Sequence, residues 1–316
     1  MLLLVHVQKR TYLNTSPKFF SLLLSPSLFS FSFQKLLEDS SFTLHEALNQ
    51  KPFLKSVSVV IPKSWRDGKC QTVVRPPKGE TPYRQADIVI SGNNHPIYGA
   101  SPYTQQSKQC GQPGDFMALP FSFLTKWNQT WETWGDPANL FVHEWVKLRY
   151  GTFDEFGYAN DPIYPNYFKS RDQIFPTGTS NEPINGIWVD AYGSPDCVSS
   201  PTNACYFQPV GTNDHVTCSL GYMHFLPTVN AFCPTSTNGQ GRMAPTKQNV
   251  LCQGKSSLEI ILGHEDFSTH LAHKSTAVDI NMKPMITVVR EPEPQYVLIM
   301  ETSSSCLLYT SPSPRD

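Results

Sequence analysis

Residues 136–156 read DPANLFVHEWVKLRYGTFDEF, and the centre of this stretch is an incomplete metal-binding motif. In an H-E-x-x-H motif, two histidines four residues apart lie on the same face of a helix and bind zinc, while the glutamate activates a zinc-bound water. His143 and Glu144 begin that motif here, but Lys147 stands where the second histidine is expected. The stretch therefore predicts the helix of a zinc hydrolase that lacks one of its metal ligands.

The residues around the motif predict a helix with a sharp turn behind it. Asp136-Pro137 is a favourable helix start, because aspartate caps the free backbone N–H groups and proline suits the first helical position. Gly151 ends the helix and permits a turn, so that Asp154 or Glu155 can fold back toward the motif. Apolar residues repeat at helical spacing and predict one buried face: Ala138, Phe141, Val142, Trp145 and Leu148.

The wider pattern resembles the calcium-activated chloride channel regulator family, whose zincin-like N-terminal domain carries the sequence HEWAHLRWGVFDEY. This chain has HEWVKLRYGTFDEF at 143–156, with lysine in place of the family's second histidine. Further segments match the family in the same order: FQKLLEDSSFTLHEALNQKPFLKSVSVVIPKSW at 33–65, ADIVISG at 86–92, PYTQQSKQCGQPGDFMALP at 102–120 and APTKQNVLC at 244–252. The resemblance covers residues 33–305.

The resemblance implies a zinc cofactor and a role for each residue of the motif. It makes His143 a zinc ligand, Glu144 the general base and Asp154 the third ligand. The second ligand falls on Lys147, and a protonated lysine has no lone pair to offer a metal ion. We therefore expect zinc affinity to be impaired, and we hypothesise that the ammonium of Lys147 pairs with Glu144 and Asp154 in a pseudoenzyme site.

Two alternatives to that hypothesis remain open at this point. A buried lysine can lose its proton, at a cost set by its shifted pKa, and then bind a metal. Other histidines can also replace the missing ligand, and His264, His270 and His273 are the candidates, although the segment HEDFSTHLAHK that contains them is typical of a polar surface.

Composition and charge exclude several other classes of protein. The chain has 316 residues, enough for one large or two ordinary domains. A net charge of −1 and a pI near 6.7 give no basic field for nucleic acid. With 27 prolines and only 16% charged residues, the sequence predicts many loops and turns and argues against a coiled coil and against long helices.

The cysteines and one glycosylation motif indicate the secretory pathway. Five cysteines lie in one stretch rich in proline, asparagine, glycine and threonine, and they predict a disulfide-stapled extension formed in an oxidising compartment: Cys197, Cys205, Cys218, Cys233 and Cys252. Free thiols are the alternative. Asn128-Gln129-Thr130 is an N-glycosylation motif, so we predict a glycan on Asn128. The predicted location is secreted or extracellular.

Both ends of the chain contain segments that we exclude from the fold prediction. Residues 1–32 include FFSLLLSPSLFSFSF, which is read as a degenerate signal sequence or as non-native sequence. Residues 306–316, CLLYTSPSPRD, resemble the translation of a sequencing adapter. No run of about 18 uninterrupted apolar residues occurs, so no transmembrane helix is predicted, and membrane association would depend on sequence beyond this chain.

The segment before the adapter-like tail predicts a linker and one strand. EPEPQYVLIMETSSS at 291–305 resembles the first strand of a von Willebrand factor A domain, which follows the zincin-like region in this family. There a D-x-S-x-S loop binds a divalent cation. Glu301, Ser303 and Ser305 have that spacing, with glutamate in place of aspartate, so we expect at most an incomplete cation site in a truncated domain spanning 286–305.

Taken together, these patterns predict an α/β zincin-like metallopeptidase domain at 33–160, followed by a Cys-rich, loop-rich extension at 161–285. The expected elements are helices at 35–49, 137–149 and 255–263 and strands at 56–61, 87–91 and 115–119, which suit a sheet packed on two helices.

Three function classes fit this architecture. The first is a secreted, calcium-activated chloride channel regulator-like protein with a degenerate metallopeptidase site, which contacts a chloride channel or another membrane protein. The second is an active zinc metallopeptidase that cleaves itself or its relatives, which requires a replacement ligand. The third is an extracellular adhesion module without enzymatic activity. Channel regulation is implied by the resemblance alone.

Overall fold

A computed structural model describes most of the two predicted regions. The described residues are 2–8, 28–48, 52–61, 86–92, 94–170, 172–197, 202, 204–234, 239–268 and 281–290. The predicted cation loop at Glu301, Ser303 and Ser305 lies outside them, as do His270, His273 and the adapter-like tail.

A mixed sheet is the centre of the fold, and it has the strand order β10-β2-β1-β3-β5-β4. β1 runs antiparallel to both of its neighbours, whereas β10 runs parallel to β2 and β3 runs parallel to β5. β4 is antiparallel to β5 and is the last strand on its side of the sheet. The bounds are β1 Leu2–Gln8, β2 Ser56–Ile61, β3 Ile88–Ser91, β4 Tyr103–Gln105, β5 Phe116–Pro120 and β10 Met285–Arg290.

β1 lies in the middle of this sheet, in a segment for which the sequence predicts no element. Its Leu4 is aligned with Val60 of β2 on one side and with Val89 of β3 on the other. This first strand joins the pair β10-β2 to the three strands β3-β5-β4, which would otherwise be separate. An apolar run such as LLLVHV is compatible with a signal sequence as well as with a buried strand, so periodicity alone does not distinguish them.

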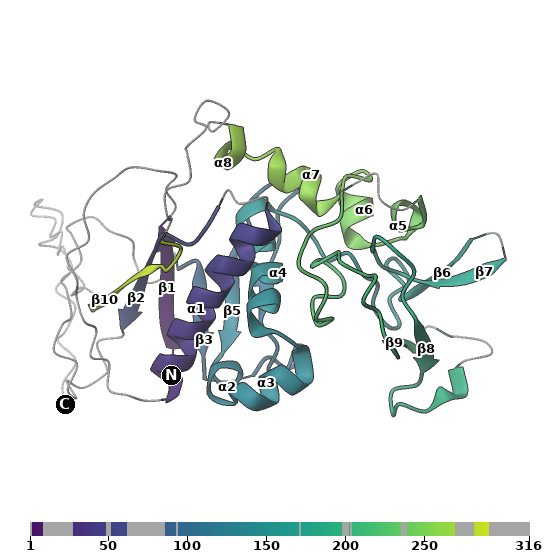
Figure 1. Ribbon diagram of the computed structural model, residues 1–316, viewed down its shortest axis with the longest axis horizontal. Coiled ribbons are helices and arrows are strands. Elements are labelled where there is room, and N and C mark those ends of the chain that lie inside the picture. The colour runs from purple at the N-terminus through teal and green to yellow at the C-terminus, as the bar shows by residue number, and fades with distance from the viewer. Residues whose placement is uncertain are drawn as a thin grey trace, which may run out of the picture.

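Two long helices, α1 (Leu28–Ala47) and α4 (Pro137–Tyr150), lie side by side over one face of the sheet (Figure 1). The core lies between these helices and the strands, because α1 contributes leucines, α4 contributes aromatic and branched residues, and the strands contribute alternating apolar positions. Its fully buried members include Leu36, Leu37, Val57, Ile88, Met117, Leu119, Phe123 and Phe141. Two short helices, α2 (Phe121–Thr125) and α3 (Trp127–Trp134), connect β5 to α4.

Beyond α4 the chain forms short hairpins and helices, as the composition predicts. The hairpins β6–β7 and β8–β9 lie at the opposite end of the molecule from β10 (Figure 1). Their bounds are β6 Tyr167–Ser170, β7 Gln173–Pro176, β8 Gly186–Val189 and β9 Tyr206–Pro209, with a 3-10 turn at Pro195–Cys197. The helices are α5 Gly239–Met243, α6 Lys247–Leu251, α7 Ser257–Leu262 and α8 Glu265–Ser268.

Three disulfides hold this region, in agreement with the prediction. Cys197–Cys205 and Cys218–Cys233 close short loops within it. The third joins Cys252, at the end of α6, to Cys110 in the loop before β5. The Cys-rich extension is therefore covalently attached to the sheet-containing part of the molecule.

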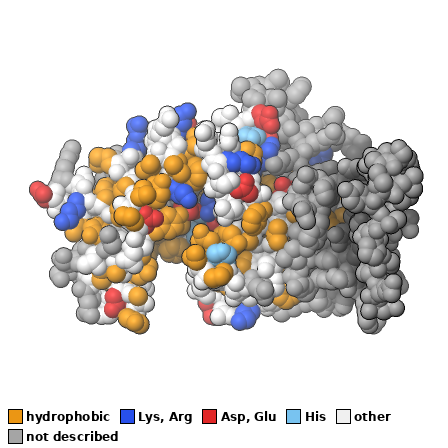
Figure 2. Space-filling model, turned by 180° about the vertical axis from the view of Figure 1, so that it is seen from behind, with side chains coloured by type: hydrophobic (Ala, Val, Ile, Leu, Met, Phe, Trp, Pro, Cys, Tyr) orange, Lys and Arg blue, Asp and Glu red, His pale blue; other side chains and the backbone are white. Residues whose placement is uncertain are grey.

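The helices predicted at 35–49, 137–149 and 255–263 and the strands predicted at 56–61, 87–91 and 115–119 are all present in the structure. The strand predicted within 291–305 lies outside the described residues. The mixed α/β class is confirmed, and the helices predicted at 35–49 and 137–149 are α1 and α4. α1 begins earlier than predicted, at Leu28, within the segment excluded from the fold prediction, and it is longer than the composition predicts. Among the described residues, no helix is both long and apolar enough to cross a membrane. On the face shown in Figure 2, Lys and Arg side chains of the described residues are scattered among acidic, hydrophobic and neutral ones.

Candidate functional site

The helix that carries the motif, α4, begins and ends as predicted. The side chain of Asp136 accepts a hydrogen bond from the backbone N–H of Ala138 at 2.8 Å, and Pro137 is the first helical residue. Gly151 has φ 67° and donates its N–H to the carbonyl of Lys147. Of the residues in α4, only Arg149 is not buried, so the whole helix is enclosed between the sheet and the Cys-rich region.

This enclosed helix brings three polar side chains of the motif into the interior. His143, Glu144 and Lys147 have 3%, 4% and 8% of their surfaces exposed. The turn at Gly151 then returns Asp154 to the same place, as the sequence predicts. Asp154 Oδ1 lies 3.0 Å from Nε2 of His143 and accepts a hydrogen bond of 2.7 Å from Nζ of Lys147.

Lys147 connects the two carboxylates of the site. Its Nζ donates to Glu144 Oε1 at 2.8 Å and to Asp154 Oδ1 at 2.7 Å. Burial by itself would lower the pKa of Lys147, but the negative charges of Asp154 and Glu144 outweigh burial and raise that pKa well above its ordinary value. Lys147 is therefore an ammonium at neutral pH, held in a buried three-member ion cluster.

Asp154 has an equally defined charge state. Burial would raise its pKa, but the positive charge of Lys147 and the hydrogen bond with His143 hold the pKa of Asp154 well below the usual range. Its second oxygen, Oδ2, accepts a short hydrogen bond from the hydroxyl of Tyr158. Burial and the neighbouring Asp154 charge raise the pKa of Tyr158, so this tyrosine stays neutral and remains a donor.

The orientation of His143 is fixed from the Cys-rich side of the molecule. Its Nδ1 donates to the backbone carbonyl of Leu220 at 2.8 Å, since a carbonyl can only accept. Leu220 is itself anchored by a backbone hydrogen bond to Ala231. The His143 ring also packs against Phe156 and His224, with ring centroids 6.2 Å and 5.2 Å away. Such a backbone acceptor is what typically orients a metal-binding histidine.

Glu155, the other carboxylate that the sequence predicted could fold back toward the motif, makes different contacts. Its carboxylate is buried and accepts a hydrogen bond of 3.1 Å from the backbone N–H of Ser257, at the start of α7. Burial raises the pKa of Glu155. The carboxylate lies against Gly221, where an added Cβ would come within 2.8 Å of it. Glu155 thus connects the turn after α4 to the Leu220 segment and to α7.

The residues present do not fit the zinc ion that the resemblance implies. His143, Glu144 and Asp154 each offer one ligand atom, and these atoms lie within 4.8 Å of one another. However, the Lys147 ammonium contacts both carboxylates directly, and it offers no lone pair. A tetrahedral zinc site needs ligands with free electron pairs at about 2.0–2.3 Å, so a cation already bonded to two of the three groups opposes metal binding.

The remaining predicted site residues lie elsewhere. His264 is not part of this cluster and contacts Asp266 and Tyr150, the last residue of α4. Asn128 lies on the surface in the first turn of α3. Three residues around the site are not predicted by the sequence patterns: Tyr158, Leu220 and His224. Only Tyr158 could have been proposed from the sequence, because it follows Asp154 at a short distance.

The sequence of this chain matches one known family over most of its length. A family model described as "Calcium-activated chloride channel N terminal" matches residues 31–274. This chain belongs to the calcium-activated chloride channel regulator family. It is 29% identical to human calcium-activated chloride channel regulator 2 over 276 residues, which cover 86% of this chain and 28% of that protein.

Other family members give the same result. The chain is 28% identical to bovine calcium-activated chloride channel regulator 1, covering 86% of this chain and 30% of that protein, and 30% identical to human calcium-activated chloride channel regulator 4, covering 74% and 25%. This chain therefore spans less than a third of the length of these relatives. No solved structure matches it, so the likeness of the α/β domain to zincins stays a prediction.

Proposed function

We propose that this protein is an extracellular regulator of calcium-activated chloride conductance that acts through contacts with a channel or another membrane protein, without hydrolysing peptide bonds. Family membership supports the regulatory role, since the relatives carry that description. The three disulfides support an extracellular location, because disulfides persist in oxidising compartments.

The position of Lys147 is the main support for the proposed loss of catalysis. Its ammonium bridges Glu144 and Asp154 at 2.8 Å and 2.7 Å in the interior. In a zinc peptidase, the glutamate must be free to take a proton from a metal-bound water. Here the carboxylate of Glu144 is paired with the ammonium of Lys147. Unlike zinc, an ammonium does not bind and polarise a water molecule for Glu144 to deprotonate. The cluster therefore serves as an internal ion pair that stabilises the fold.

Zinc stoichiometry tests the degenerate site. We expect the purified full chain to contain no zinc and a Lys147→His variant to bind about one zinc ion per chain. The matched control is the double variant Lys147→His with His143→Ala, which should again bind none. One zinc ion on the unaltered chain would contradict the degenerate site and would favour an active metallopeptidase.

Chloride currents test the regulatory role separately. Purified protein added to cells that express a calcium-activated chloride conductance should change the current. A Glu144→Gln variant whose circular dichroism shows that it is folded should change it equally, because no proton transfer by Glu144 is involved. An unchanged current in the presence of folded protein would contradict the regulatory role and favour an adhesion module. An effect lost in Glu144→Gln protein that is verified to be folded would favour catalysis.

A further inference from the structure

In the sequence Asn128-Gln129-Thr130, the first two residues are exposed and the third is buried. Asn128 is the second residue of α3, and its side chain is exposed. N-linked glycans are attached to Asn-x-Ser/Thr sequences in the same oxidising compartment in which disulfides form. We propose that Asn128 carries an N-linked glycan, and that the first sugar of this glycan covers the exposed ring of Trp131.

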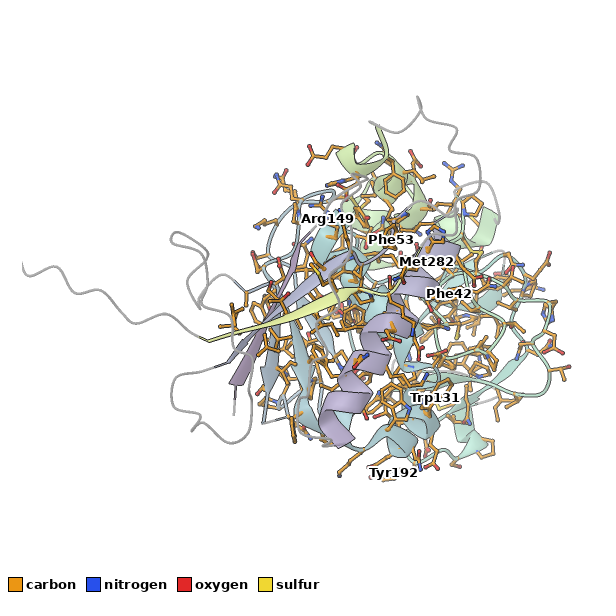
Figure 3. All side chains as sticks on the ribbon, turned by 60° about the vertical axis from the view of Figure 1, so that its left-hand side comes forward. Phe42, Phe53, Trp131, Arg149, Tyr192 and Met282 are labelled. Carbon is orange, nitrogen blue, oxygen red and sulfur yellow. A yellow bond between two sulfur atoms is a disulfide. The ribbon has the colours of Figure 1, made fainter. Side chains whose placement is uncertain are left out.

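The covering role follows from the geometry of α3. Residues three apart on a helix are neighbours on the same face, so Asn128 and Trp131 lie one turn apart. The Trp131 side chain is 44% exposed, which leaves a large apolar ring in water. Figure 3 labels Trp131 in the lower part of the view, at the end of the molecule formed by α2 and α3. A pyranose ring presents C–H groups on one face, and these pack favourably on an indole.

The timing of the modification follows from Thr130. The enzyme that transfers the glycan needs the hydroxyl of this residue, but in the folded protein the Thr130 side chain is 1% exposed. Its Oγ1 donates a hydrogen bond of 2.8 Å to the carbonyl of Phe123. The acceptor sequence is therefore accessible only before α3 folds, so the glycan is added to the nascent chain.

The chemical step is an ordinary group transfer. The donor is an oligosaccharide linked to a polyprenyl pyrophosphate, which the secretory pathway supplies. The amide nitrogen of Asn128 forms a bond to the anomeric carbon of the first sugar and loses one proton. The bond between that carbon and the pyrophosphate oxygen breaks, and polyprenyl pyrophosphate leaves with the electron pair. No oxidation or reduction takes place.

Peptide mapping tests the assignment. The full chain is secreted from eukaryotic cells behind a cleavable leader and digested with trypsin, which releases residues 127–147 as one peptide. This peptide contains Asn128 and no other glycosylation sequence, whereas the other Asn-x-Ser/Thr sequence of the chain, at Asn14, falls in the peptide 11–18. We expect a glycan on the 127–147 peptide. An unmodified Asn128 in disulfide-bonded, secreted protein overturns the proposal.

Two variants separate the modification from folding. Asn128→Gln should lose the glycan from the 127–147 peptide while keeping the fold, because the Asn128 side chain is exposed. Thr130→Ser should keep both the glycan and the hydrogen bond to Phe123, since serine retains the hydroxyl. Folded, unglycosylated protein incubated with the transferase and its donor should remain unmodified, and efficient modification would overturn the proposed timing.

Oxidative footprinting of the tryptophans tests whether the first sugar covers the ring of Trp131. An endoglycosidase that leaves the first sugar should keep Trp131 protected, whereas removal of the whole glycan should raise the labelling of Trp131 several-fold. Trp145, in the same peptide and 3% exposed, is the internal control and should stay unlabelled throughout. Equal labelling of Trp131 with and without the first sugar overturns the covering role.

Discussion

Lys147 shows how one residue changes the chemistry of a buried site while the helix around it is kept. The helix requires only that the side chain at this position be accommodated in the interior. A lysine is accommodated there because Glu144 and Asp154 are both within hydrogen-bond distance. Removing a lone ammonium from water is costly. Lys147 can therefore be buried in the folded protein only because both carboxylates pair with it.

Removing the lysine charge should therefore destabilise the protein strongly. We expect Lys147→Met to lower the free energy of unfolding by about 3–5 kcal/mol, because it leaves two buried carboxylates without their cation. Chemical denaturation measures this loss. The matched control is Lys283→Met, whose side chain is 71% exposed and pairs with Glu38 at 3.0 Å, and which should cost less than about 0.5 kcal/mol. Equal costs for the two variants would contradict the role of Lys147.

His224 should make the stability depend on pH near neutrality. Burial and the charges of His143 and Lys147 hold the pKa of His224 well below its ordinary value. Because this folded-state pKa is lowered, the unfolded chain binds a proton first, at a pKa of about 6.5. The contribution of His224 is fully present above that pH and is lost as the pH falls, by up to about 1.4 kcal/mol per pH unit.

A His224→Phe variant isolates this effect. Phenylalanine keeps an aromatic ring beside His143 but cannot be protonated. Denaturation at pH 7 and pH 5 should show a smaller loss of stability in the variant than in the unaltered chain. If both proteins lose the same stability between these pH values, the dependence belongs to other groups.

Some residues of the site could be predicted from the sequence, and others could not. His143, Glu144 and Lys147 follow from helical spacing, and Asp154 follows from the glycine turn, because all four lie within one local segment. His224 and the Leu220 carbonyl come from a segment about 80 residues further on, and no spacing rule connects it to α4. A backbone acceptor, moreover, has no side-chain signature in the sequence.

Among the secondary-structure elements, α4 is the one whose termini matter most for the site. Its C-terminal end is held by the loop that carries Cys110, since Gly111 donates to the carbonyl of Gly151 and Gly114 donates to the carbonyl of Leu148. These bonds satisfy helix carbonyls that would otherwise lack partners. The chain that leaves α4 toward Asp154 therefore starts from a fixed point.

Replacing Gly151 with alanine should destabilise the C-terminal end of α4 for two reasons. The backbone there has φ 67°, and an added Cβ would come within 2.1 Å of the carbonyl oxygen of Gln112. We expect Gly151→Ala to cost about 2–4 kcal/mol, from the left-handed backbone and from the clash. Gly99 has φ 59° with nothing within 4 Å, so Gly99→Ala should cost only about 1 kcal/mol. Equal denaturation midpoints for the two variants would contradict the close approach.

For the molecule as a whole, the disulfide from Cys110 to Cys252 is the longest covalent connection among the described residues. It joins positions 142 residues apart, whereas Cys197–Cys205 spans 8. Since the loop that a disulfide closes restricts the unfolded chain, the longer loop should contribute more stability.

Paired alanine variants measure this difference. Cys110→Ala with Cys252→Ala should lose about 5 kcal/mol, and Cys197→Ala with Cys205→Ala about 2.5 kcal/mol, in the chain-entropy description. Denaturant unfolding of both, with the remaining disulfides verified by mass spectrometry, checks the order. A larger loss from the short loop would show that native contacts, and not loop closure, dominate.

Local patterns in the sequence determined the longer helices, three strands of the sheet, the incomplete motif and the turn that returns Asp154, because each depends on neighbours within a few turns of chain. They also determined that the long middle region is held by disulfides. Only the tertiary structure decided which cysteines pair, that Leu2–Gln8 is a central strand, and that Leu220 and His224 complete the surroundings of His143. These contacts join distant segments, and their partners are fixed by packing and hydrogen bonding in three dimensions, which no short pattern encodes.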